Sequence, residues 1–181
     1  MGTFHIEGWD FQWITGEVDD PEDLCLHGSV RVHIGDTVLE DTGTVSATAL
    51  YLLKSLTEDH KMNAEDVQMI PCCGHFLIAN EDLSQVTILG CDTGTDWSIL
   101  HENGRIKLVL PSGQETFVEP EDYQREVFAF ADQVEAYYRS CTPKRLPKDD
   151  FARNGYRAFW NEWCRRRGLQ SPPPVEEDDN L

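Results

Sequence analysis

A chain of 181 residues with 40% hydrophobic residues is long enough to form one domain with a substantial buried core. Its 33 acidic and 15 basic residues give a net charge of -18, which disfavours binding to nucleic acids and anionic membranes and favours cationic partners. No apolar run approaches the roughly 20 residues that span a bilayer, and the N-terminal residues lack the pattern of a signal peptide, so we expect a soluble cytoplasmic protein.

The first strand is expected over residues 4–14, where Trp9, Phe11 and Trp13 alternate with polar residues and would share one face. An acidic turn follows, GEVDDPED, and residues 29–39 alternate as a second strand. Ser46 could cap a helix over residues 46–60. Further strands are expected over residues 67–79, broken near Pro71 and Gly74, and over 86–90, 97–101, 105–110 and 115–118.

Two helices are expected in the C-terminal third. Pro120 begins one that runs to about residue 141, with apolar residues spaced alternately by four and three. The second runs from about residue 150 to 167 and stops at Gly168. The predicted fold is therefore α+β: an antiparallel sheet or meander of about six strands, with three main helices packed on it. Residues 1–168 form the single globular domain, and residues 169–181 are expected to be a flexible acidic tail rich in proline.

Cysteine and histidine residues form two Cys-x-His pairs, Cys25 with His27 and Cys73 with His75. Residues two apart on a strand share a face, so the two pairs could together supply four ligands to zinc, with Cys91 and His33 as substitutes. The alternative is that these are core thiols, because cysteine is often buried. Without a signal peptide, six cysteines are expected to be thiols, ligands or core residues rather than a disulfide framework. Cys72 and Cys73 would point to opposite faces of a strand.

The segment Asp92-Thr93-Gly94-Thr95-Asp96 resembles the active-site stretch of aspartic proteases. That resemblance implies a carboxylate on a loop after a strand and, because there is no second such stretch, a homodimer that brings two carboxylates together. An Asp/Thr/Gly turn is the simpler interpretation. A cysteine nucleophile, Cys73 or Cys91 with a distant histidine, is a further alternative, so an enzyme centred on Cys73, His75 and Asp92 stays open. No phosphate-binding loop or other familiar catalytic motif is present.

The charge is uneven along the chain: residues 1–60 carry -10, residues 61–120 carry -6 and residues 121–181 carry -2. Charge of this kind steers association with a cationic partner, and solubility alone is the competing explanation. We therefore expect a non-enzymatic acidic interaction protein that binds a basic protein, as bacterial immunity proteins inhibit secreted nuclease toxins. No cofactor is expected on this interpretation. The predicted partner-binding residues are Asp19, Asp20, Glu22, Asp23, Asp36, Glu40 and Asp41.

Overall fold

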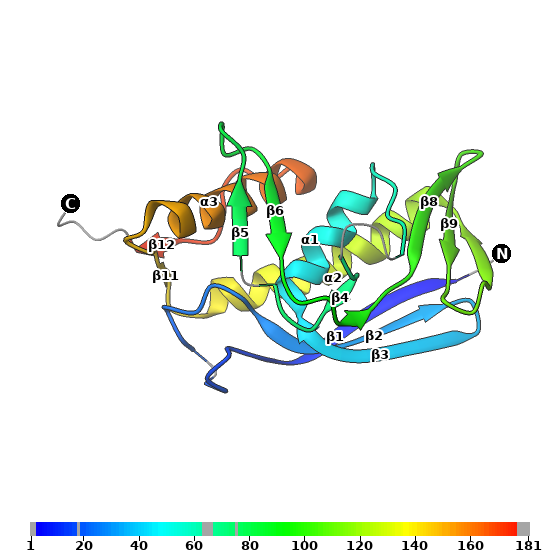
Figure 1. The fold of residues 1–181 in the computed structure, drawn as a ribbon, viewed down its shortest axis with the longest axis horizontal. Coiled ribbons are helices and arrows are strands. Elements are labelled where there is room, and N and C mark those ends of the chain that lie inside the picture. The colour runs from blue at the N-terminus through cyan, green and yellow to red at the C-terminus, as the bar shows by residue number, and fades with distance from the viewer. Residues whose placement is uncertain (1–2, 18, 63–66, 75, 177–181) are drawn as a thin grey trace.

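Three helices and a set of mainly antiparallel strands confirm the α+β fold in the computed structural model, which describes residues 3–17, 19–62, 67–74 and 76–176 (Figure 1). The strands are divided among several sheets. The two largest have three strands each, in the orders β1-β2-β3 and β10-β9-β8. Their bounds are β1 Phe4–Gln12, β2 His27–Ile34, β3 Thr37–Thr44, β8 Ser98–Glu102, β9 Arg105–Val109 and β10 Glu115–Val118.

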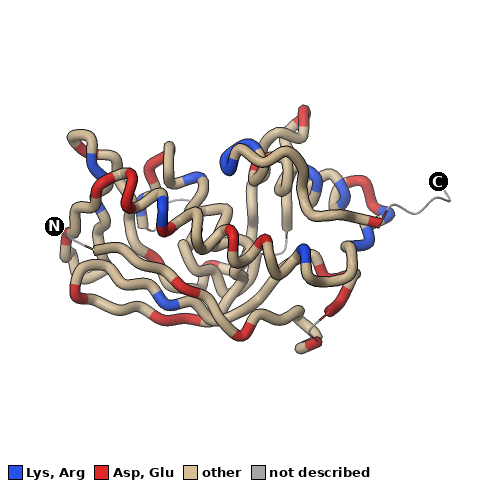
Figure 2. The backbone as a smooth tube through the Cα atoms, turned by 180° about the vertical axis from the view of Figure 1, so that it is seen from behind, with Lys and Arg blue, Asp and Glu red and all other residues tan. Residues whose placement is uncertain are grey.

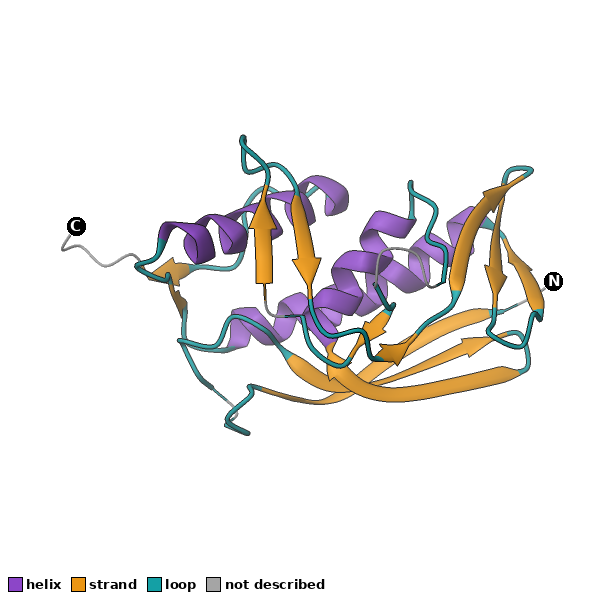
Figure 3. Cartoon of the chain, viewed as in Figure 1, coloured by secondary structure: helices purple, strands orange, loops and turns teal. Residues whose placement is uncertain are grey.

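The first sheet supports the core because one of its faces is apolar along every other residue. Phe4 and Ile6 of β1 and Val30, Val32 and Ile34 of β2 are all buried. Helix α2, Pro120–Ser140, lies along this face beside α1, Val45–Ser55, and no helix covers the opposite face in the view of Figure 3. Tyr123, Val127, Phe130 and Val134 of α2 are buried as the sequence predicts, but the next buried tyrosine is Tyr138, whereas the predicted Tyr137 and Cys141 are only partly buried.

Strand β1 differs from the prediction because it contains an irregularity between Trp9 and Gln12. Asp10 there has a positive φ of 52°, which reverses the alternation of side chains. Phe11 therefore packs among the inward glycines of β1 and β2, whereas Trp9 lies beside the Arg31 guanidinium, 4.9 Å from the ring centroid. The prediction that Trp9 and Phe11 share one core face is wrong for this reason.

The helix boundaries are largely those that the sequence predicts. Helix α3, Asp150–Arg167, begins after Asp149, whose side chain accepts a hydrogen bond from the Ala152 amide, and ends at Gly168 with φ +67°. Helix α1 is shorter than expected and ends at Ser55. The chain turns at residues 56–58 and then forms a β-bridge at His60, whose backbone exchanges two hydrogen bonds with that of Ile99.

The middle of the chain forms short antiparallel pairs. Strand β4, Ile70–Pro71, pairs with β7, Gly94–Thr95, and β5, Phe76–Ala79, pairs with β6, Val86–Leu89. The predicted Asn103-Gly104 hairpin is confirmed between β8 and β9, with both turn residues at positive φ. The β5–β6 pair packs on α3, as Figure 1 shows.

The segment expected as a tail begins after Gly168. Within it, β12, Val175–Glu176, pairs in parallel with β11, Lys144–Arg145, while residues 177–181 lie outside the described residues. Among the helices described, none is both long enough and apolar enough to cross a bilayer.

Candidate functional site

Three cysteine sulfurs meet where two loops cross. Cys72 and Cys73 follow β4, and Cys91 follows β6. Cys72 and Cys91 are joined by a disulfide, and the Cys73 Sγ lies 2.9 Å from the Cys91 Sγ. All three sulfurs lie within 4.8 Å of one another, and we call them the three-cysteine cluster. In the part of the chain that the structure describes, no other group of three or more Cys, His, Asp or Glu side chains comes this close.

One prediction about these cysteines is wrong, and another has an exception. Cys72 and Cys73 were expected on opposite faces of a strand, but β4 ends at Pro71, so both lie in a loop where alternation does not apply. Both can therefore approach Cys91. The sequence predicts thiols, ligands or core residues rather than a disulfide framework, and the Cys72–Cys91 disulfide is an exception, which forms because the loop brings residues 19 apart in sequence together.

Hydrogen bonds hold the two loops in register around the sulfurs. The Cys72 amide donates to the Thr93 carbonyl at 3.1 Å, and the Cys91 amide donates to the Cys73 Sγ at 3.1 Å. The Thr93 hydroxyl lies 2.9 Å from the Cys72 Sγ and 3.2 Å from the Cys91 Sγ. One amide and one hydroxyl thus lie within hydrogen-bonding distance of the three sulfurs, and the hydroxyl can donate to either Cys72 or Cys91.

The predicted zinc ligands Cys25, His27, Cys73 and His75 do not reappear as one group. Of these, the three-cysteine cluster contains Cys73 only. The Cys25 thiol donates to the Gly74 carbonyl at 3.3 Å, and burial raises the pKa of Cys25 to about 12. His27 lies at the start of β2, and His75 lies outside the described residues. A high thiol pKa disfavours the thiolate that a metal requires, so Cys25 is a poor ligand.

The two aspartates of the DTGTD segment have different environments. Asp92 is exposed, whereas the Asp96 carboxylate lies 2.7 Å from the His60 Nε2 and accepts a hydrogen bond from the Met69 amide at 3.1 Å. Asp96 therefore fixes the chain after α1 to the start of β4. The Asp92–Thr93–Gly94 part crosses β4 closely: a Cβ on Gly94 would lie 2.2 Å from the Ile70 carbonyl oxygen. A side chain at position 94 would therefore clash with β4, which explains why this residue is glycine.

The acidic segment after β1 is an ordered loop built on internal partners. Asp19 accepts hydrogen bonds from the Thr142 amide and hydroxyl at 2.9 and 2.7 Å, which lower the pKa of Asp19 below its ordinary value. Asp20 accepts from the amides of Glu22 and Asp23, and Asp23 accepts from the amides of Ile14 and Cys25. We call residues 14–23, Val18 excepted, the acidic loop.

A buried lysine lies beneath the acidic loop. Lys144 is 2% exposed, its Nζ lies 3.0 Å from the Trp13 ring centroid, and it donates a hydrogen bond to the Asp20 carbonyl. Burial lowers the pKa of Lys144, while the charges of Asp19, Asp20 and Asp23 act in the opposite direction. The Lys144 side chain therefore offsets part of the negative charge of the acidic loop.

The other three predicted partner residues lie on β3 and its turn. Asp36 is exposed in the β2–β3 turn, Glu40 pairs with Arg31, and Asp41 accepts a hydrogen bond from the Thr95 hydroxyl at 2.7 Å. Strand β2 separates this turn from the acidic loop by eight residues, or about 26 Å. Figure 2 shows acidic residues along the whole length of the chain in that view. The seven predicted acids thus form two groups.

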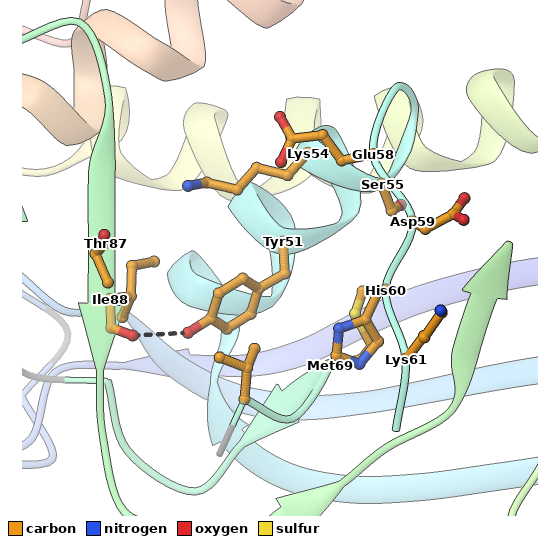
Figure 4. Close-up of a pocket in the computed structure, with 11 residues that line it drawn as sticks. Tyr51, Lys54, Ser55, Glu58, Asp59, His60, Lys61, Met69, Thr87 and Ile88 are labelled. Carbon is orange, nitrogen blue, oxygen red and sulfur yellow. Dashed lines mark hydrogen bonds between the residues drawn. The ribbon is translucent and has the colours of Figure 1, made fainter. Parts of the chain in front are cut away.

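A polar pocket of about 510 Å³ opens between α1, β6 and the chain that follows α1 (Figure 4). Several of its polar groups already have partners. The Tyr51 hydroxyl donates to the Ile88 carbonyl at 3.2 Å, and burial raises the pKa of Tyr51, so this donor stays protonated. Lys54 donates to the Val86 carbonyl at 2.6 Å, and Asp59 accepts from His101. These interactions serve the fold, and we assign no reaction to the pocket.

Some of these residues were missed by sequence reasoning. Thr93 was considered only as part of a turn, and Lys144 was not considered at all. The CC pair was visible as a signal for Cys72, but its partner Cys91 could be identified only from the pairing of β4 with β7. Comparison with protein-family models, curated proteins and solved structures gave no match, so a functional proposal depends on the chemistry of the chain itself.

Proposed function

We propose that this chain is a non-enzymatic interaction protein that binds a basic protein through its acidic loop, in the manner of an inhibitor or immunity protein. The observation that carries the proposal is that most basic side chains are already paired, whereas carboxylates are in excess. Most of the 15 basic residues already pair with carboxylates in the described part of the chain: Arg31, Lys54, Lys107, Arg125, Arg139, Arg145, Arg153, Arg165, Arg166 and Arg167. The excess of carboxylates therefore determines the outward field.

The acidic loop suits protein binding because its internal hydrogen bonds fix its shape before a partner arrives. Preorganised groups lose less conformational entropy on binding than mobile ones do. Ile14 is 67% exposed beside the carboxylates, and an apolar side chain among charges is a typical anchor at a protein interface. Glu17 is exposed, and the Glu22 side chain is 73% exposed although it pairs with Arg145. These two carboxylates are the ones most available to lysine and arginine side chains.

The test reverses charge at the acidic loop and measures association with a basic probe. The variant Glu17→Lys/Glu22→Lys changes the net charge by +4, and we expect its association rate with an arginine-rich peptide to fall about tenfold at low salt. The difference from the unmodified protein should shrink as ionic strength rises, because salt screens steering. Stopped-flow fluorescence over a salt series gives both quantities. Exposed ion pairs contribute about 0–1 kcal/mol, so the variant is expected to fold.

A matched control separates a local patch from the overall charge. Glu81→Lys/Glu121→Lys also adds +4, at two exposed positions outside the acidic loop. The proposal predicts a clearly smaller loss of association rate for this control than for the loop variant. Equal losses in the two variants would show that net charge alone acts, and the acidic loop would then not be the binding surface.

A further inference from the structure

The three-cysteine cluster is independent of the acidic loop and has the chemistry of a metal site. We propose that the reduced protein binds one zinc ion through the thiolates of Cys72, Cys73 and Cys91. Thiolate sulfur is a preferred ligand of zinc, with a Zn–S distance of about 2.3 Å. Tetrahedral geometry at that distance places two sulfurs about 3.8 Å apart. All three sulfurs lie within 4.8 Å of one another, so after reduction the Cys72 and Cys91 sulfurs have to separate from bonding distance while Cys73 stays in place.

The loops that carry the sulfurs are held close by their backbones. A Cβ on Gly90 would lie 1.9 Å from the Cys73 carbonyl oxygen, so only glycine allows the segment before Cys91 to approach Cys73 this closely. The amide of Cys72 is tied to the Thr93 carbonyl on the other side. The sulfurs therefore converge from two segments fixed on both sides, which lowers the entropy lost when an ion binds.

Two hydrogen-bond donors lie beside the three sulfurs. The Cys91 amide donates to the Cys73 Sγ, and the Thr93 hydroxyl lies within hydrogen-bonding distance of the other two sulfurs. Supporting hydrogen bonds of this kind orient ligands and tune a metal site. Cys72 is exposed, so the cluster is open to solvent on one side and leaves a fourth coordination position for water.

Zinc and the disulfide compete for the same sulfurs. A phosphine reductant supplies the two electrons that break the Cys72–Cys91 bond and leaves two thiols beside Cys73. Zinc then displaces the protons of the three thiols and binds the thiolates. The oxidised protein offers Cys73 alone, so it should not bind the ion. This gives the proposal an internal control in which the sequence is unchanged.

Cobalt is a suitable probe, because Co²⁺ occupies thiolate sites of zinc proteins and its complexes absorb light. We expect phosphine-reduced protein to bind one equivalent of Co²⁺ with thiolate-to-cobalt charge-transfer absorption, and zinc to abolish that absorption. Cys73→Ser should weaken Co²⁺ binding by more than the roughly 10–100-fold cost of losing a supporting hydrogen bond. Cys164→Ser is the general control, and Cys25→Ser tests the ligand set predicted from sequence; both should bind Co²⁺ unchanged.

A second measurement needs no variant and is unaffected by misfolding. Zinc added to the reduced protein should slow alkylation of Cys72, Cys73 and Cys91 at least about tenfold, and mass spectrometry of peptides reports each site. Saturable binding that protects these three sites supports the proposal. Absence of saturable Co²⁺ binding to the reduced protein overturns it, as does unchanged affinity in a folded Cys73→Ser variant. Either failure leaves the acidic-loop proposal unaffected, because that test involves no cysteine.

Discussion

Glu162 of α3 is a buried carboxylate on which three elements depend, and its removal gives a sharp test of the packing. The side chain is 1% exposed. It accepts hydrogen bonds from the Val86 amide of β6 and from the Arg166 Nε, each at 2.9 Å, and the Lys54 Nζ of α1 lies 3.3 Å away. Glu162→Ala would leave a buried amide and three cations, Lys54, Arg165 and Arg166, without this carboxylate.

Breaking a buried ion pair by removing one partner costs about 3–5 kcal/mol. An unsatisfied buried amide costs about 1–3 kcal/mol. Because these costs overlap at one side chain, we expect Glu162→Ala to lower the free energy of unfolding by about 4 kcal/mol, a large part of the roughly 5–15 kcal/mol that holds a domain folded. Glu162→Gln keeps an acceptor for the Val86 amide and should cost about half as much.

Equilibrium urea unfolding, followed by tryptophan fluorescence, measures these differences. Glu81→Ala is the control, because Glu81 is exposed in the turn between β5 and β6 and its removal should change the free energy of unfolding by no more than about 0.5 kcal/mol. A loss below about 1 kcal/mol for Glu162→Ala would refute the reasoning, since it would mean that water or relaxed neighbours satisfy the exposed partners at little cost.

Two further predictions concern packing and pH. Gly155→Ala places a Cβ 1.9 Å from the Leu77 carbonyl oxygen, so α3 must move from β5; thermal unfolding should show a loss of about 1–3 kcal/mol, and an unchanged melting temperature would contradict this. The Thr142 hydrogen bonds lower the pKa of Asp19 below the ordinary 3.8, so their stabilisation is complete above that pH and is lost as the pH falls through the lowered pKa. The melting-temperature difference between unmodified protein and Asp19→Asn should therefore shrink in acid, and a constant difference would count against it.

Strong local patterns predicted much of the fold. Helix α2 repeats buried residues at helical spacing over 21 residues, and Asn103-Gly104 places two positive-φ residues between two strands. Such signals need no long-range information. The β1 irregularity had no comparable signal, because a single residue, Asp10, changes conformation within a run that otherwise alternates. The end of α1 was predicted too far along the chain for a different reason: His60 pairs with Ile99, which is distant in sequence.

The three-cysteine cluster could be predicted only in part. The sequence drew attention to Cys73 and Cys91, but the predicted ligand set assumed that each Cys-x-His pair lies on a regular strand. Strand β4 is two residues long and ends at Pro71, so the cysteines after it follow loop geometry. The pairing that brings Cys91 to them involves Ile70 with Thr95 and Pro71 with Gly94, four residues with no distinctive local pattern. The site therefore depends on tertiary contacts, which local sequence patterns do not reveal.

Strand β3 carries partner residues predicted from the sequence and also supports the three-cysteine cluster, which limits the variants that can test partner binding. The Asp41 carboxylate accepts a hydrogen bond from Thr95 of β7, and a Cβ on Gly43 would lie 2.2 Å from the Pro71 carbonyl oxygen, so β3 supports both strands next to the three-cysteine cluster. Asp41 was predicted to face a partner, but its reversal to lysine would also displace β7 and thereby the Thr93 donor. A loss of binding in that variant would have two explanations. Glu17 and Glu22 have no hydrogen bond to the cysteine loops among the described residues, so their reversal leaves the three-cysteine cluster intact and removes only the exposed Glu22–Arg145 pair.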